Sequence, residues 1–470
     1  MIGGIAVPGS TAPVERRDLE GVFAKPPGAA ERVGLETEIA AVDPVTGDSR
    51  PYHGERGVRA LLDAVLGVGG WHPVRHGADL VALTRDDGAQ ITLEPGGAVE
   101  YGSAPHGDLV TLLDRTRRDL AALAGCAARV GIALVPGANY PFTGISGAKW
   151  APKPHSEIVR DHLARIGAGG AWGPHVMALT LSTQVTLDYT GPADLARKLR
   201  AQVAASTAAA ALFVNSPLEA GRPTGLLSRR MRYWTRHDPR RTGVLAPALA
   251  EGFTAADFVD WALALRMIYR RDRAGRYVPA PDRPFAVLLD EGFGDGTAPD
   301  LADWLLHLSQ IWTDVRLRRT LELRAVDGPP HAALGAVPAF WVGLTYDASS
   351  CADAWELLRR HTAADHRALV DDVAARGLRA RLAGTPVAEV AAELLRLARR
   401  GLAARVDRGL EHPSATALLE PLEEVAATGT TFAEQCLRRW SGEFHESPER
   451  YVRAYRIPVD HECVPGRLLR

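Results

Sequence analysis

The sequence predicts an α+β fold in which a largely antiparallel sheet is surrounded by helices. Three observations support this prediction. Segments that alternate apolar and polar residues are separated by helices and loops of uneven length, unlike a regular βαβ series. No period of about 20–50 residues repeats, which argues against solenoids and propellers. The 470 residues contain no clear linker, so one catalytic domain over 31–470 is expected, with a helical part from about residue 332.

Composition narrows the class of protein. Lys and Arg number 55 against 56 Asp and Glu, so no overall charge favours nucleic acid or an anionic membrane as a partner. The apolar run Ala201–Val214 is too short to cross a bilayer, and the N-terminus lacks the pattern of a signal peptide. The cysteines form no CxxC pair, which argues against zinc and disulfides and favours a cytoplasmic protein. They are Cys126, Cys351, Cys436 and Cys463.

The first half of the chain contains most of the predicted strands. Residues 1–30, rich in Gly, Pro and Ala, are expected to form a flexible leader. Alternation and turn residues then predict strands, and apolar residues at helical intervals predict helices. The expected strands are Val33–Val42, Ile91–Tyr101 around a Pro-Gly-Gly turn, Ile132–Val135 and Val176–Tyr189, and the expected helices are Gly57–Gly67, Leu109–Gly131 and Pro192–Asn215.

The second half is predicted to be mainly helical. Arg222–Gly243 reads as an arginine-rich loop, and Arg319–Val326 as a strand. Helical spacing covers Phe253–Arg270, Leu301–Trp312 and most of Ala332–Leu402, with a break at 384–386.

Paired acidic residues are the first candidates for chemistry. Glu36 and Glu38 are two apart, so on a strand they face the same side. Two neighbouring carboxylates repel each other when buried, and a magnesium ion with oxygen ligands would remove that cost. Glu94 and Glu100 are also an even number of residues apart, with Pro-Gly-Gly between them. A solvent-facing row of charges and an exposed hairpin are the alternative interpretations.

A second set mixes acid, amide and arginine. Glu322 and Arg324 share one face of an otherwise apolar strand, either as an internal ion pair or as a metal ligand beside a phosphate-binding guanidinium. Gln184 lies on the polar face of Ser182–Asp188, which is either the wet side of a sheet or the floor of a cleft. Arg222–Gly243 holds seven arginines suited to phosphate or carboxylate, with nucleic acid as the competing ligand. Because the sequence has no GxxxxGK[ST] or GxGxxG loop, any use of ATP would depend on carboxylate-held metal and arginines.

Five motifs, taken in order, resemble those of glutamate–cysteine ligases of the plant and proteobacterial type. They are Gly34–Glu38, Glu94–Glu100, Thr183–Asp188, Asp238–Gly243 and Leu321–Asp327. The resemblance covers residues 31–345 and is closest to the actinobacterial branch that makes γ-glutamylcysteine for ergothioneine. It implies a glutamine-synthetase-like fold, an open funnel formed by a curved antiparallel sheet. Thr186 departs from the pattern, since the family often has Asn there, and no cysteine-binding residue can be matched.

The resemblance also implies an activity and its site. ATP would phosphorylate the γ-carboxylate of L-glutamate, and the amine of L-cysteine would displace the phosphate, with Mg²⁺ bound to acidic residues. Arg324 and Arg230 would be catalytic, and Gln184, Arg324 and Arg241 would bind the nucleotide. The metal ligands would be Glu36, Glu38, Glu94, Glu100 and Glu322.

Two other functions remain open from the sequence. One is a ligase of the same fold that uses another amine or amino acid in a secondary-metabolite pathway, and the other is a non-catalytic binding protein that retains the fold. The expected partners are small molecules, and the expected oligomeric state is a monomer or a homodimer.

Overall fold

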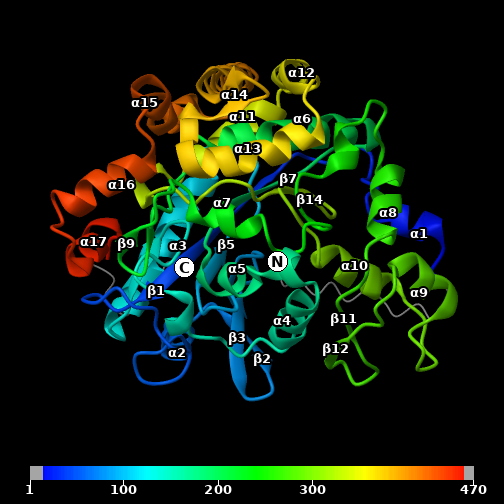
Figure 1. The fold of residues 1–470 in the computed structure, drawn as a ribbon, viewed down its shortest axis with the longest axis horizontal. Coiled ribbons are helices and arrows are strands. Elements are labelled where there is room, and N and C mark those ends of the chain that lie inside the picture. The colour runs from blue at the N-terminus through cyan, green and yellow to red at the C-terminus, as the bar shows by residue number, and fades with distance from the viewer. Residues whose placement is uncertain (1–13, 460–470) are drawn as a thin grey trace.

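A nine-stranded sheet forms the centre of the molecule in the computed structural model, which describes residues 14–459 (Figure 1). All its pairings are antiparallel, in the order β14-β15-β7-β1-β5-β4-β3-β2, with β6 paired to the second half of β1. The sheet is open, which confirms the α+β class. Its strands are β1 (Val33–Val42), β2 (His72–His76), β3 (Asp79–Thr84), β4 (Gln90–Leu93), β5 (Val99–Gly102), β6 (Ala133–Pro136), β7 (Thr183–Leu187), β14 (Val315–Leu317) and β15 (Leu321–Leu323).

The two faces of this sheet differ in chemistry because side chains alternate along each strand. Leu35 and Ile39 of β1, with Val185 of β7, point into the largest apolar core. Helices α3, α6 and α11 pack against the sheet on this side. The intervening residues carry the acids and amides, so the alternation directs them to the opposite face.

Helices fill most of the remaining structure, and α11 to α14 lie together along the top of Figure 1. Among the helices of residues 14–459, none has the length and apolar character needed to span a bilayer. The helices are α1 (Arg16–Gly21), α2 (Val58–Val68), α3 (Leu109–Arg129), α4 (Ser156–Arg165), α5 (Gly173–Leu179), α6 (Pro192–Ala210), α7 (Arg229–Trp234), α8 (Ala255–Leu263), α9 (Phe285–Glu291), α10 (Leu301–Ser309), α11 (Ala336–Thr345), α12 (Ala348–Leu358), α13 (Ala363–Arg376), α14 (Val387–Asp407), α15 (Glu420–Thr428), α16 (Phe432–Ser441) and α17 (Pro448–Tyr455).

Four short strand pairs lie outside the main sheet. Three are antiparallel hairpins, and the parallel pair β10–β13 brings the loop before residue 245 beside the end of α10. The pairs are β8 (Leu218–Glu219) with β9 (Arg222–Pro223), β10 (Thr242–Gly243) with β13 (Trp312–Thr313), β11 (Tyr269–Arg271) with β12 (Tyr277–Pro279), and β16 (Arg381–Leu382) with β17 (Thr385–Pro386).

Three expectations from the sequence differ from the structure. Of the predicted leader, residues 1–13 lie outside the described residues, but α1 is helical and Leu19 is fully buried in a second apolar core. The first part of the predicted strand over 176–189 is helix α5, because Pro174 starts a helix and Val176 and Leu179 share its buried face. The arginine-rich loop contains helix α7, whose first turn is capped by Ser228.

Candidate functional site

The polar face of the sheet brings most of the predicted site residues into one row. In the β1–β5 register Glu38 lies opposite Glu100, and in the β1–β7 register Glu36 lies opposite Gln184. On the next strand Glu322 lies opposite Thr186. Cross-strand neighbours share a face, so this row runs from β5 across β1 and β7 to β15.

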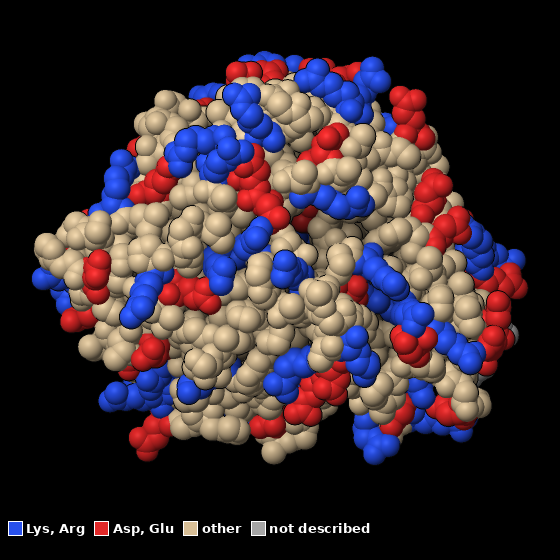
Figure 2. Space-filling view, viewed as in Figure 1, with Lys and Arg blue, Asp and Glu red and all other residues tan. Residues whose placement is uncertain are grey.

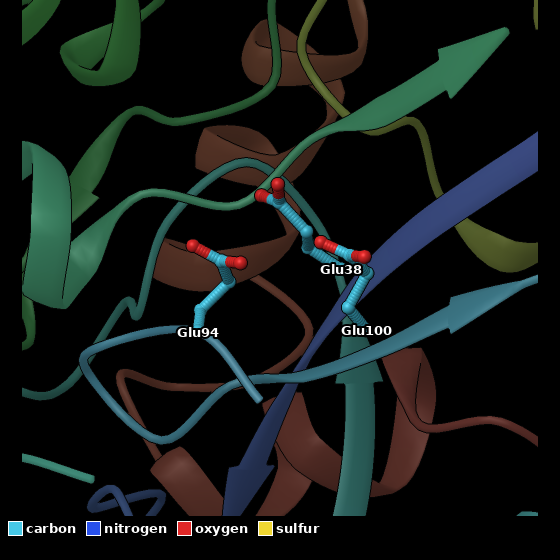
Figure 3. A group of neighbouring side chains, drawn as sticks. All are labelled: Glu38, Glu94 and Glu100. Carbon is cyan, nitrogen blue, oxygen red and sulfur yellow. The ribbon is translucent and has the colours of Figure 1, made fainter. Parts of the chain in front are cut away.

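At one end of the row three carboxylates converge. Glu38, Glu94 and Glu100 each contribute an oxygen, and these oxygens all lie within 4.8 Å of one another. Figure 3 shows Glu38 and Glu100 projecting from adjacent strands and Glu94 from the loop beside them, with their carboxyl groups turned toward a common space. Glu36 lies two residues before Glu38 on β1. It is only 6% exposed, but it is not part of this group.

The Pro95-Gly96-Gly97 turn places Glu94 in this group. The backbone N–H of Glu94 donates to the carbonyl of Ala98 at 2.8 Å, and the N–H of Gly97 donates back to the carbonyl of Glu94 at 2.8 Å. Gly97 has a φ of +82°, and a Cβ at Gly96 would lie 2.1 Å from the Ala178 carbonyl oxygen of α5. Only glycine fits both positions, so this turn is held tightly against α5.

Burial and mutual repulsion perturb these carboxyl groups. Burial, together with the charges of Glu94 and Glu100, raises the pKa of Glu38 from its usual 4.5 to about 8. The pKa of Glu100 is raised by burial and by Glu94, although it accepts a hydrogen bond from Thr92 at 3.0 Å. The pKa of Glu36 is raised by burial and by Glu322 and Glu100.

This acidic group fits a divalent cation. The donors are hard carboxylate oxygens from three residues, the type of ligand that magnesium takes. A bound cation would offset the repulsion that raises these pKa values. The charges of Arg230 and Arg324 offset the rise in the pKa of Glu38 only in part, and the Lys153 ammonium lies 3.5 Å from Glu94. Among residues 14–459, the side chains best placed to hold such an ion are therefore those of Glu38, Glu94 and Glu100.

At the other end of the row, Glu322 is surrounded by guanidinium groups. It accepts hydrogen bonds from Arg316 through two nitrogens, from Arg318 at 2.9 Å and from Arg324 at 2.6 Å. Burial alone would raise its pKa, but the three arginines hold the pKa well below its usual range. The structure therefore shows the internal ion pair, and a role for Glu322 as a metal ligand stays a prediction.

Gln184 connects the two ends of the row. Its side-chain amide donates to a carboxylate oxygen of Glu38 at 2.9 Å, and its carbonyl oxygen accepts from Arg324 at 2.5 Å. The amide thus satisfies an acid on one side and a guanidinium on the other with a single fixed orientation. This arrangement places Gln184 and Arg324 directly beside the acidic group, as the sequence predicts.

The two remaining predicted arginines have different surroundings. Arg230 is 4% exposed, donates to the backbone carbonyls of Arg324 at 2.7 Å and Ala325 at 3.1 Å, and lines a cavity. Arg241 uses its three guanidinium nitrogens on Asp238 and on the carbonyls of Arg266 and Gln310. It does not line the cavity, so the structure does not bring Arg241 to the site.

The cavity beside the arginine end has a volume of about 260 Å³. Arg230 and Arg324 form its inner wall together with Asp314, and Trp234 and Trp312 contribute aromatic surface. On the outside, Lys, Arg, Asp and Glu are interspersed over the face shown in Figure 2, with no large region of one sign. The cavity therefore suits a small polar ligand that packs against aromatic side chains. The exterior on this face has no continuous basic region that would bind an extended polyanion.

Arg316, Arg318 and Asp314 were not identified from the sequence. The pattern that could have found them is the alternation Asp314, Arg316, Arg318, which places all three on the face of Glu322 across the β14–β15 hairpin. This alternation is hard to recognise in the sequence because the strand Val315–Leu317 has only three residues.

Comparison with known proteins assigns the family. The model of glutamate-cysteine ligase family 2 matches residues 32–454. The chain is 31% identical over 439 residues to the chloroplastic glutamate–cysteine ligase of Solanum lycopersicum, covering 93% of this chain and 81% of the relative. The Arabidopsis thaliana enzyme is 31% identical over 440 residues, covering 93% and 82%. The chain therefore belongs to glutamate-cysteine ligase family 2.

A solved structure supports the fold. The glutamate–cysteine ligase of Francisella tularensis, solved in complex with AMP, superposes with a TM-score of 0.55 at 12% identity, covering 92% of this chain and 91% of that one. The expected glutamate–cysteine ligase architecture is thus confirmed at the level of the fold. The individual site residues stay predictions.

Proposed function

We propose that the protein is an ATP-dependent glutamate–cysteine ligase that joins the γ-carboxylate of L-glutamate to the amine of L-cysteine through a γ-glutamyl phosphate. The observation that carries this proposal is the polar row, with a cation-binding acidic group at one end and arginines at the other, in a member of this family. Phosphoryl transfer requires that the negative charge of the phosphate be neutralised and that the reactants be aligned. The arginine end of the row supplies positive charge directly, and the acidic end offers carboxylates that can bind a cation.

The chain's own residues would divide the work as follows. Glu38, Glu94 and Glu100 would hold magnesium, which neutralises charge on the nucleotide phosphates when bound. Arg324 faces the same space and presents a guanidinium to the transferring phosphoryl group. Gln184 and Glu322 would orient Arg324, because both accept hydrogen bonds from the same guanidinium nitrogen, at 2.5 Å and 2.6 Å.

ATP as the nucleotide is supported by two observations. The relative from Francisella tularensis was solved with AMP. Arg324 belongs to the polar row and also lines the cavity. A phosphorylated glutamate bound at Arg324 would therefore be accessible to residues of the row and to a ligand in the cavity. The expected supporting role of Arg230 at the glutamate or phosphate end is compatible with its position on the cavity wall.

The use of the product and the location belong to the same proposal. γ-Glutamylcysteine would feed the synthesis of ergothioneine or a related thiol. A cytoplasmic location is favoured because no two cysteines of the sequence form a CxxC pair. A ligase of this fold that accepts another amine is the second candidate, because no residue that recognises the cysteine thiol has been identified.

The test is ADP release coupled to product mass. The protein is incubated with ATP, Mg²⁺, L-glutamate and either L-cysteine, 2-aminobutyrate or a mixture of amines. We expect magnesium-dependent ADP release and a product with the mass of γ-glutamylcysteine, with cysteine preferred over the other amines. If no amino-acid pair gave ADP, the ligase proposal would be overturned. If another amine were preferred, the ligase activity would stand and only the assignment of cysteine as the acceptor would change.

A further inference from the structure

Asp314 is an acidic residue of the cavity that neither the metal-binding group nor the arginine-paired Glu322 explains. It lies just before β14 and lines the cavity with Arg230 and Arg324. Among the described residues, no hydrogen bond or ion pair engages its carboxylate, while its backbone N–H donates to Gly243 at 2.8 Å and its carbonyl accepts from Arg324 at 2.8 Å. The other acid of the cavity, Asp371, is already paired with Arg232.

A half-buried carboxylate with no partner among the described residues is costly, so its position needs an explanation. Burial raises the pKa of Asp314 to about 6, and the charges of Arg230 and Arg324 limit the rise. The group is therefore mostly ionised at neutral pH but close enough to neutrality to accept a proton. An ammonium group entering the cavity would supply the missing partner.

We propose that Asp314 binds the ammonium group of the acceptor amino acid and removes the proton that must leave before the nitrogen can attack. This inference rests on the proposed ligase function and adds a residue for the acceptor, for which the sequence offers none. It also states what the acceptor must carry, namely an amine that is protonated in solution.

The location next to Arg324 distinguishes the acceptor from glutamate. The attacking nitrogen must come within about 3–3.5 Å of the carbonyl carbon of the phosphorylated γ-carboxyl group. Arg324 is the arginine proposed to face the phosphoryl group, and its backbone N–H donates a hydrogen bond to the carbonyl of Asp314. The α-ammonium of glutamate is separated from that carbonyl carbon by the rest of the side chain, so it is not the amine that this position requires.

The proposed step balances as follows. The ammonium group gives one proton to the Asp314 carboxylate and becomes a neutral amine. The amine nitrogen forms a bond to the carbonyl carbon of the γ-carboxyl group, the bond from that carbon to the phosphate oxygen breaks, and the phosphate leaves with the electron pair. The second proton lost from nitrogen goes to the departing phosphate, and Asp314 releases its own proton to solvent. No oxidant, reductant or further reactant is needed.

The test compares two acceptors in Asp314→Asn. L-Cysteine is protonated at neutral pH, whereas hydroxylamine is uncharged there and needs no base before it attacks. We expect Asp314→Asn to lower kcat/KM for cysteine by about 10²-fold or more, the range of general base catalysis. The rate with hydroxylamine, followed as γ-glutamyl hydroxamate, should stay within a few-fold of wild type, and KM for glutamate should not change.

Two variants serve as controls. Asp371→Asn removes the ion-paired acid of the same cavity and should leave cysteine turnover nearly unchanged. Asp314→Glu keeps a carboxylate and should restore part of the cysteine activity. Because the backbone of Asp314 makes its hydrogen bonds without the side chain, Asp314→Asn should fold, as thermal unfolding would verify.

The outcomes separate this inference from the proposed function. Equal losses with cysteine and hydroxylamine, a raised KM for glutamate alone, or no loss at all would overturn the role of Asp314. Wild-type protein that releases no ADP with either acceptor would instead overturn the ligase function itself.

Discussion

The two ends of the polar row contain the same type of residue in opposite electrostatic environments. At the acidic end, Glu38 shares a buried space with Glu94 and Glu100, and its pKa rises to about 8. At the arginine end, Glu322 is more deeply buried, yet three guanidinium groups hold its pKa far below the usual value. Burial acts in the same direction on both, so neighbouring charge decides the outcome.

In the described part of the chain, only the arginine end of the row has its charges compensated without a ligand. Glu322 has its cations within the protein, while the acidic end has carboxylates in excess of cations among the described residues. The same substitution at the two ends should therefore change stability in opposite directions.

The largest effect is expected at the arginine end. Glu322→Gln removes the anion that holds Arg316, Arg318 and Arg324 together and leaves buried positive charge uncompensated. We expect the free energy of unfolding at pH 7 to fall by about 3–5 kcal/mol, as when one partner of a buried ion pair is lost. Denaturant unfolding measures this, with Glu356→Gln, an exposed ion-paired acid, as the control expected to change little. A loss as small as that of the control would contradict the ion-pair account.

A smaller effect of opposite sign is expected at the acidic end. At pH 7 without divalent cations, the folded protein holds a proton on Glu38 that the unfolded chain has released. Glu38→Gln removes that cost, so the free energy of unfolding should rise by roughly 2–3 kcal/mol. Denaturant unfolding in EDTA compares the free energy of unfolding of wild type and Glu38→Gln. A clear loss of stability in the variant would show that the carboxylates of the acidic group do not destabilise the folded protein.

The pH dependence follows from the same raised pKa. Glu38 ionises at about pH 4.5 in the unfolded chain but near pH 8 in the folded protein. The unfolded state therefore binds fewer protons between these values, and this group's contribution to stability falls as pH rises through them and levels off above about pH 8. The free energy of unfolding is measured in EDTA from pH 5 to pH 9 for wild type and for Glu38→Gln, and the difference between the two proteins isolates this contribution. A difference that is flat across the range would contradict the raised pKa.

Much of the fold and row could be predicted because the relevant segments are regular. β1 begins and ends at the predicted Val33 and Val42, since ten alternating residues followed by a turn leave little ambiguity. The polar face was predictable from the i, i+2 spacing within each strand. What single strands cannot give is their order in the sheet, and this order brings Gln184 between Glu38 and Arg324.

Other features depended on contacts that the local sequence does not contain. The partners of Glu322 and Arg241 could not be predicted from their own motifs, because they lie on a neighbouring short strand or at positions distant in the sequence. Asp314 lies outside the five family-like motifs, and its place beside Arg230 and Arg324 depends on the tertiary structure of the cavity. Likewise, Leu19 lies in a segment whose composition indicates a leader, and only its burial in a second core shows otherwise.

Magnesium titration by calorimetry tests the central claim that the acidic end holds a divalent cation and the arginine end does not require one. Wild type, Glu38→Gln and Glu322→Gln would be titrated at pH 7, under conditions where each is folded. We predict saturable binding to wild type, at least about tenfold weaker binding to Glu38→Gln, and nearly unchanged affinity for Glu322→Gln. Equal magnesium affinity in wild type and Glu38→Gln would contradict the account.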